Sequence, residues 1–209
     1  MLPQVTMALQ LHNSYWVLRH GRSKANDAGI IVSTVENGVP PKYGLSESGR
    51  QQAKEAGEEL ERQLAQTDTS TVKVFCSPLT RTLDTAVIVA ESLGIYTTDS
   101  RFQVVPELIE RNFGEYELQS DNNYSSVWEV DACDVTAAPK GGGESVEQVA
   151  ERIRSLFAAL EKDNTGKNIV LVSHGDTLSI MWAVVKGLPL QDHRQHGLNT
   201  GQLKILHAA

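Results

Sequence analysis

The chain has 209 residues, of which 40% are hydrophobic and 22% charged, and its formal net charge at pH 7 is −7. This length and composition indicate one globular domain over residues 1–209 with a buried core, and they exclude a disordered chain. The negative charge argues against nucleic acid or an anionic membrane surface as a partner, so a phosphorylated ligand would need a local basic pocket.

Neither a membrane span nor a secretory signal is expected. The longest apolar run, residues 180–185, is far shorter than the roughly 20 residues of a spanning helix. Residues 1–11 lack the basic start and apolar centre of a signal peptide. We therefore expect a cytoplasmic protein, with a processed organelle form as the alternative.

The first half of the chain alternates short apolar runs with helical patterns. The expected elements are a strand at 15–18, a loop at 21–45, a helix at 46–64, a strand at 72–76, a helix at 80–93 and a strand at 102–105. Ser46 should cap the first helix and Gly94 should end the second. A loop as long as 21–45 in a compact domain usually has a function.

The second half has an irregular insert followed by a regular pattern. The expected elements are the insert at 111–144 with one helix near 125–133, a helix at 145–160, a strand at 168–173, a helix at 177–186 and a strand at 203–206. Strands that alternate with helices predict an α/β fold with a mostly parallel sheet. In such sheets, ligands bind beyond the carboxyl ends of the strands.

Two histidines directly follow predicted strands. His20 lies between two arginines in Arg19-His20-Gly21-Arg22, and His174 follows the strand at 168–173. Two neighbouring guanidiniums disfavour a protonated imidazole, so the ring of His20 should be neutral and nucleophilic. The tetrapeptide alone fits a solvated strand end equally well, but a second histidine in the same position favours a functional site.

Other polar residues fall at the same predicted edge of the sheet. They are Arg19, Arg22 and Asn26, then Ser77 and Arg81, then Glu107 and Glu110. Two imidazoles, several guanidiniums and a carboxyl group suit phosphoryl transfer through a phosphohistidine. One histidine would attack phosphorus, the cations would hold its oxygens, and the carboxylic acid would protonate the leaving alcohol.

Five blocks of residues, in order along nearly the whole chain, resemble the histidine phosphatase superfamily, the phosphoglycerate mutase-like group. The blocks are Arg19-His20-Gly21 with Ser23 and Asn26; Ser77-Pro78-Leu79 with Arg81-Thr82 and Thr85-Ala86; Leu108 with Glu110, Phe113-Gly114 and Glu117; Gly143-Glu144-Ser145; and Ser173-His174-Gly175. The resemblance implies a three-layer α/β/α sandwich with a mostly parallel central sheet. It also implies an enzyme that needs no metal or organic cofactor and acts on a small phosphorylated molecule.

Carried over by position, the resemblance implies catalytic roles for three residues. His20 would be the phosphorylated nucleophile, His174 would line the phosphate pocket, and Glu110 would be the proton donor. Arg19 and Arg81 would also line that pocket.

Two further residues of the first block are expected to bind substrate, and two positions depart from the family pattern. For Arg22 and Asn26 a solvated position in the loop is the alternative. Arg22, followed closely by Lys24, stands where many members have Glu or Gln. Leu118 stands where a glycine is common. Both departures should lie where the pocket meets the leaving group.

Several alternatives accompany this hypothesis. Glu107 competes with Glu110 as the acid. A metal hydrolase would use His20, Glu110, His174 and Asp176 as ligands, but the arginines beside His20 would repel a dication. A noncatalytic binding module would lack the nucleophile or the acid, and both are present.

Within the enzymes, a phosphoglycerate mutase is the alternative to a phosphatase. A mutase insert should supply several cations, whereas residues 112–144 contain one, Lys140, among seven acidic residues. Phosphatase is therefore the favoured reading. The remaining histidines, His12, His193, His196 and His207, are expected to be surface residues without a role.

Overall fold

The computed structural model describes residues 8–209, so the expectation for the N-terminus lies partly outside the described residues. The strands are β1 (Ser14–Arg19), β2 (Val72–Cys76), β3 (Phe102–Val104), β4 (Asn168–Ser173) and β5 (Leu203–His207). They form one sheet in the order β3-β2-β4-β1-β5. Only β5 is antiparallel to its neighbour, which confirms the mostly parallel sheet.

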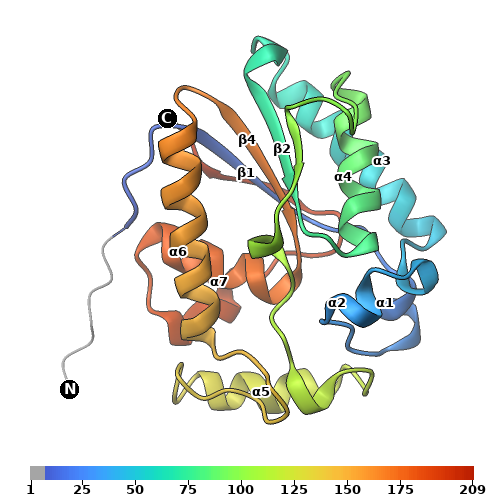
Figure 1. Cartoon of the computed structure of the whole chain (residues 1–209), viewed down its shortest axis with the longest axis vertical. Coiled ribbons are helices and arrows are strands. Elements are labelled where there is room, and N and C mark those ends of the chain that lie inside the picture. Colours follow the sequence, from blue (N-terminus) through green and yellow to red (C-terminus); the bar gives the residue numbers. More distant parts are fainter. Residues whose placement is uncertain (1–7) are drawn as a thin grey trace.

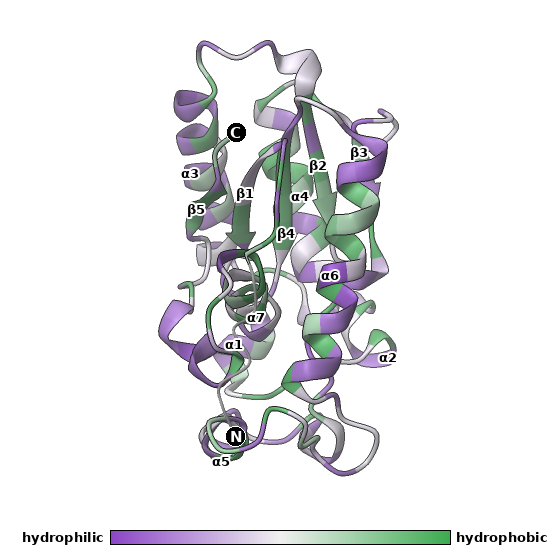
Figure 2. Ribbon diagram, turned by 90° about the vertical axis from the view of Figure 1, so that its left-hand side faces the viewer, coloured by the Kyte–Doolittle hydropathy of each residue, from purple (hydrophilic) through white to green (hydrophobic). Residues whose placement is uncertain are grey.

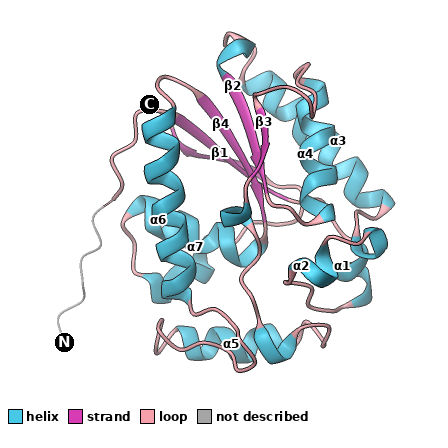
Figure 3. Cartoon of the chain, in the orientation of Figure 1, coloured by secondary structure: helices cyan, strands magenta, loops and turns pink. Residues whose placement is uncertain are grey.

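Helices cover both faces of this sheet, as the cartoon coloured by secondary structure shows (Figure 3). The helices are α1 (Lys24–Ala28), α2 (Val35–Gly38), α3 (Glu47–Gln63), α4 (Thr80–Ser92), α5 (Asn123–Asp131), α6 (Val146–Asp163) and α7 (Gly175–Lys186). The pair α3 and α4 lies on one face and the pair α6 and α7 on the other (Figure 1). The three-layer α/β/α sandwich is thereby confirmed.

Two apolar clusters hold the layers together, because adjacent side chains of a strand point to opposite faces. On β1, Tyr15 and Val17 pack with the buried residues of α6 and α7. Trp16 and Leu18 pack with those of α3 and α4. The strands are mostly hydrophobic in Figure 2, whereas α3 and α6 mix both colours, as helices that bury one face do.

The expected loop at 21–45 contains two short helices. Ser23 caps α1 through a capping box, in which its hydroxyl accepts a hydrogen bond from the backbone N–H of Asn26 and the Asn26 side chain accepts one from the backbone N–H of Ser23. Thr34 caps α2 in a similar way, by accepting from the N–H of Asn37. These local side-chain caps stabilise turns that are too short to show hydrophobic periodicity.

The carboxyl ends of β1, β2 and β4 point toward the end of the molecule where α1, α2 and α5 lie (Figure 1). Helix α5 belongs to the insert and crosses beyond the sheet. A 3₁₀ segment, Leu190–His196, follows α7 and was not predicted from the sequence. Within residues 8–209, no helix has both the length and the apolar character needed to cross a membrane.

Candidate active site

The pairing of β1 with β4 brings the two strand-end histidines together. Arg19 and Ser173 are register partners in these parallel strands, so His20 and His174 leave the sheet side by side. The backbone N–H of His20 donates to the carbonyl of Ser173 at 3.0 Å. The two imidazole rings are both buried, with centroids 5.2 Å apart in an edge-on arrangement.

The hydrogen bonds of His20 show which of its two ring nitrogens carries the proton. Nδ1 lies 2.8 Å from the carbonyl oxygen of Gly21, which can only accept, so the ring proton belongs on Nδ1. Nε2 accepts a hydrogen bond from Nε of Arg81 at 3.0 Å. Burial, together with the charges of Arg81 and Arg19, lowers the pKa of His20 well below its usual value. The ring is therefore neutral at pH 7, the form that the sequence predicts for a nucleophile.

The guanidiniums of Arg19 and Arg81 are only partly satisfied by the protein. Nη1 of Arg19 donates to the carbonyl of Leu198 at 2.7 Å, and Nη2 of Arg81 donates to that of Val32 at 2.8 Å. Nε of Arg19 and Nη1 of Arg81 are buried and have no partner in residues 8–209. Buried donors without a partner are costly, and an anion between these two side chains would satisfy them.

His174 is held from behind by a hydroxyl of the second sequence block. Its Nε2 lies 2.8 Å from Oγ of Ser77, while its Nδ1 is buried without a partner in residues 8–209. Burial and the charge of Arg81 lower the pKa of His174 well below its usual value. His174 packs against the ring of His20 and does not itself line the cavity described below.

Glu110 faces the same cavity, with 7% of its surface exposed. Its Oε1 accepts hydrogen bonds from the backbone N–H of Arg111 at 3.0 Å and from the backbone N–H and hydroxyl of Thr177, both at 3.2 Å. Burial and the charge of Asp176 raise the pKa of the Glu110 carboxyl above its usual value. Glu107, the competing acid, is exposed and lies outside this cavity.

A cavity of about 210 Å³ connects these groups. Its floor is formed by residues from the sheet edge and the following loops, and its wall by the insert. The polar and charged lining residues are Arg19, His20, Ser23, Asn26, Arg81, Glu110, Asp121, Tyr124, Asp176 and Arg194, with Trp128 among the others.

The two substrate-binding candidates of the first loop lie in different places. Asn26 lines the cavity, and its Oδ1 accepts from the backbone N–H and the hydroxyl of Ser23. Arg22 does not line it, because its side chain is exposed and turned into an ion pair with Asp27. The second cation that acts on His20 is thus Arg81 from α4, not the neighbouring Arg22.

Leu118 also lies outside the cavity and is 46% exposed. Its φ of 62° falls in the left-handed region that favours glycine. A glycine would adopt this backbone conformation without strain. The departure from the family pattern at Leu118 therefore affects the backbone of the insert and not the lining of the cavity.

A buried charge network supports the insert wall and was not expected from the sequence. Arg111 is completely buried and donates from Nη1 and Nη2 to both carboxylate oxygens of Asp131, at 2.6 and 2.9 Å. It also donates to Asp176 at 3.2 Å. The other oxygen of Asp176 accepts from Arg194 at 2.7 Å and from the indole N–H of Trp128 at 3.0 Å. Two arginines and two aspartates balance one another here.

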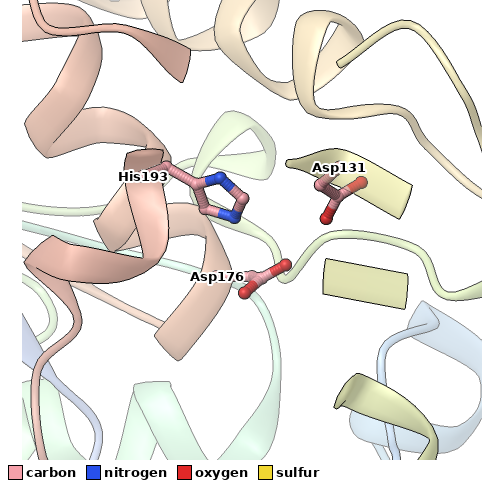
Figure 4. Close-up of side chains that lie close together, drawn as sticks. All are labelled: Asp131, Asp176 and His193. Atoms are coloured by element: carbon pink, nitrogen blue, oxygen red, sulfur yellow. The ribbon is translucent and has the colours of Figure 1, made fainter. Parts of the chain in front are cut away.

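Three side chains of this region are spaced closely enough to suggest a metal site: Asp131, Asp176 and His193 (Figure 4). The expectation of a surface position for His193 is wrong, because it is fully buried. Arg111, however, already donates to both carboxylates. A dication would have to sit against a buried guanidinium, so we assign no metal to this cluster.

Sequence reasoning missed the wall of the cavity, above all Tyr124 and Trp128 of the insert and Arg194 of the 3₁₀ segment after α7. None of these residues follows a strand. The insert also has no hydrophobic periodicity that would predict which of its side chains face the sheet. The one available signal was the spacing of Tyr124 and Trp128, which are four residues apart: had the predicted helix near 125–133 been extended to Tyr124, as α5 shows, their rings would have been placed on one face.

The chain is similar to known proteins of one family. A family model described as "Histidine phosphatase superfamily (branch 1)" matches residues 15–209. The chain is 28% identical over 183 residues to the adenosylcobalamin/alpha-ribazole phosphatase of Escherichia coli, which covers 84% of this chain and 80% of that protein. It is 29% identical over 186 residues to the 2,3-bisphosphoglycerate-dependent phosphoglycerate mutase of Rhizobium etli, covering 84% and 81%.

A third relative is much longer than this chain, and a solved structure shares its fold. Agropine synthesis reductase of Rhizobium rhizogenes is 28% identical over 203 residues, which cover 92% of this chain and 38% of that protein. The mycobacterial glucosyl-3-phosphoglycerate phosphatase superposes with a TM-score of 0.72 at 25% identity, over 91% of this chain and 88% of that one.

Proposed function

Since the chain belongs to the histidine phosphatase superfamily, we propose that it is a phosphatase that hydrolyses a small phosphomonoester through a phosphohistidine on His20. One observation carries the proposal. The ring of His20 lines a cavity, its unprotonated Nε2 accepts a hydrogen bond from Nε of Arg81, and other buried donors of Arg19 and Arg81 have no partner among residues 8–209. A phosphate dianion would satisfy both arginines and bring its phosphorus to Nε2.

The first half of the proposed reaction transfers the phosphoryl group to the enzyme. Nε2 of His20 attacks phosphorus, a P–N bond forms, and the P–O bond to the alcohol breaks. Glu110 gives its proton to the departing oxygen, which needs a carboxyl group that is protonated when substrate binds. The raised pKa of Glu110 supports that role. The proton stays on Nδ1, and its hydrogen bond to the Gly21 carbonyl orients the ring.

The second half returns the enzyme to its starting state. Glu110, now a carboxylate, takes a proton from water as the water oxygen attacks phosphorus. The P–N bond breaks, inorganic phosphate leaves, and His20 is neutral again. Each group thereby ends in the protonation state in which it began, and no step requires a metal ion or an organic cofactor.

The phosphoglycerate mutase reading is the alternative, and relatives of both kinds exist. A mutase substrate has a carboxylate that needs a cation beyond those that hold the phosphate. Arg194 is the remaining cation of the cavity, and it is paired with Asp176. Lys140, the one cation in residues 112–144, does not line the cavity, whereas Asp121 does. These charges favour a phosphatase.

The size of the cavity favours a small substrate. Its volume of about 210 Å³ lies below the roughly 300–1,000 Å³ of pockets for drug-sized ligands. A small phosphorylated metabolite is therefore the proposed ligand class, in keeping with the expectation that the protein binds neither nucleic acid nor a membrane surface. We also keep the cytoplasmic location as a proposal.

The test is turnover and trapping of the intermediate in a chelator. We expect purified protein to hydrolyse p-nitrophenyl phosphate in EDTA, and a quench in base followed by mass spectrometry to find phosphate on His20. His20→Ala should lose turnover and the label, while the exposed His12→Ala serves as a matched control and retains both. Activity that needs an added divalent ion, or a label on another residue, would contradict the proposal.

A further inference from the structure

Tyr124 reaches the active-site cavity from the insert, on the side opposite the sheet. It lies on α5, lines the cavity and is partly buried. Its hydroxyl makes no hydrogen bond with any residue in the described range 8–209. A partly buried tyrosine that points its hydroxyl into a binding site commonly uses it to bind a ligand or water. Because Tyr124 lines the cavity, its hydroxyl is free to bind water there, and a ligand when the site is occupied.

The ring of Tyr124 is fixed on both sides. The ring of Phe113 meets it edge-on, with centroids 4.8 Å apart, and Trp128 stacks on it at 5.2 Å with an interplanar angle of 7°. Trp128 is in turn covered by the guanidinium of Arg194, whose Cζ lies 3.7 Å from the ring centroid. The indole N–H of Trp128 is anchored on Asp176. These contacts on both sides of the Tyr124 ring fix the position of its hydroxyl.

The charges around the Tyr124 hydroxyl are those of the phosphate site. Burial and the charge of Glu110 raise the pKa of Tyr124, and the charges of Arg81 and Arg19 oppose that rise. The hydroxyl is therefore protonated at neutral pH and can donate a hydrogen bond. It lies close enough to both phosphate-binding arginines to be affected by their charges.

We propose that Tyr124 is a further catalytic residue, whose hydroxyl donates a hydrogen bond to a non-bridging oxygen of the phosphoryl group held against His20. The proposal rests on the proposed function of the same site. Arg19 and Arg81 supply donors from the sheet side, and Tyr124 supplies one from the insert, so the phosphoryl group is held from two sides. Tyr124 transfers no proton, and Glu110 keeps the role of acid.

The proposal predicts that Tyr124→Phe weakens the binding of the phosphoryl group in the ground state and in the transition state alike, because one of its hydrogen bonds is lost. This variant keeps the stacked ring and removes only the hydroxyl. A hydrogen bond to a charged group corresponds to a loss of roughly 10- to 100-fold. We expect such a loss in kcat/KM, equal for an alkyl phosphate and for p-nitrophenyl phosphate. The dissociation constants of inorganic phosphate and orthovanadate, measured by calorimetry without turnover, should rise in the same range.

Tyr116→Phe is the matched control. Tyr116 packs in the same insert cluster but does not line the cavity, so this variant should behave as the wild type in both assays. The thermal midpoint of each variant checks that the fold is retained.

Two results would overturn the proposal. Unchanged phosphate and vanadate affinity together with unchanged turnover would show that the hydroxyl does not contact the ligand. A loss confined to the alkyl ester, with normal phosphate affinity, would place the hydroxyl at the leaving oxygen instead. If the wild type binds phosphate but hydrolyses no ester, the function in the previous section fails, and the binding measurements still decide the role of Tyr124.

Discussion

Two titratable side chains, His20 and Glu110, face one cavity from the edge of the sheet. Burial acts on them in opposite directions, because it disfavours whichever form is charged. It lowers the pKa of the imidazole and raises that of the carboxyl group. The charges of Arg81 and Arg19 lower the pKa of His20 further, while Asp176 raises the pKa of Glu110 further and Arg81 opposes that rise. Both shifts favour the neutral forms, an unprotonated imidazole and a protonated carboxyl group, which are the forms that the proposed attack on phosphorus and protonation of the leaving group would use.

The role of Glu110 can be separated from phosphate binding by changing the leaving group. Glu110→Gln should lower kcat on alkyl phosphates by roughly 10²–10⁴-fold, the range of general acid catalysis. The loss should shrink sharply on p-nitrophenyl phosphate, whose leaving group departs without a proton. The affinity for inorganic phosphate should change little, because Arg19 and Arg81 remain. Steady-state kinetics on both esters measures the difference.

Glu107→Gln provides the comparison, since Glu107 is exposed and lies outside the cavity. This substitution should lower kcat only slightly on both esters. Equal losses of Glu110→Gln on the two leaving groups would indicate a structural role for Glu110, and a large, leaving-group-dependent loss of Glu107→Gln would transfer the acid role to that residue.

At the scale of elements, the sequence predicted the residues that strands position and missed those that tertiary contacts position. His20, His174 and Arg81 follow strands or open helices, so the apolar runs before them were enough to place them at one edge. Tyr124 and Arg194 belong to segments without periodicity, and the buried ion pairs of Arg111 and Asp176 fix where those segments lie. A contact between distant charges has no signature in local sequence.

The start of α3 holds the loop that follows His20. The carbonyl of Arg22 accepts from the backbone N–H of Ser46 at 2.9 Å, and the N–H of Arg22 donates to the side chain of Gln52 at 2.7 Å. Between these bonds, the backbones touch: a Cβ on Gly49 would lie 1.9 Å from the Arg22 carbonyl oxygen. Glycine at this position permits the close approach of helix and loop.

Gly49→Ala should therefore move the loop that carries the nucleophile. Forcing an extra methyl group into a packed contact costs about 1–3 kcal/mol, and we expect a loss of stability of that size, measured by urea unfolding. The kcat/KM for p-nitrophenyl phosphate should fall as well, because the backbone of Gly21 positions the ring of His20.

Gly57→Ala, in the same helix, is the control. Its Cβ would meet mainly the side chain of Ser92, which can rotate away. The change should be nearly neutral for activity, and alanine favours the helix by about 0.5–1 kcal/mol. Equal effects of the two variants would show that the contact between Gly49 and Arg22 has no special role.

At the scale of the whole molecule, a chain with a net charge of −7 encloses a site rich in cations and neutral histidines. Strands β1 and β4 are about 150 positions apart in the chain, and their pairing brings together His20, which lines the cavity, and His174, which packs against it. The insert closes the site from the opposite side, and His193 lies buried behind the wall with its Nε2 unpartnered within residues 8–209. Folding thus removes three imidazoles from water, and this couples the stability of the molecule to pH.

The pKa values of His20, His174 and His193 are all lowered in the folded state. Below about pH 6.5 the unfolded chain binds protons that the folded protein does not, so stability falls as the pH falls. Each proton taken up on unfolding corresponds to roughly 1.4 kcal/mol per pH unit. Glu110 has the opposite effect on stability. Because its pKa is raised in the folded state, the folded protein binds this proton at a higher pH than the unfolded chain does, so this group adds stability as the pH falls.

We therefore expect the free energy of unfolding to decrease between pH 7.5 and pH 5.5, and to decrease more steeply in Glu110→Gln, which lacks the opposing proton. At neutral pH the same variant should be more stable than the wild type. In the wild type, unfolding lets the Glu110 carboxyl group ionise in water, which favours the unfolded chain, and the glutamine of the variant cannot ionise. Urea unfolding of both proteins at several pH values measures these slopes. In Glu110→Gln, where this opposing proton is absent, a free energy that is constant or rises down to pH 5.5 would mean that the buried histidines are already protonated in the folded protein. A neutral His20 nucleophile would then be excluded along with the stability argument.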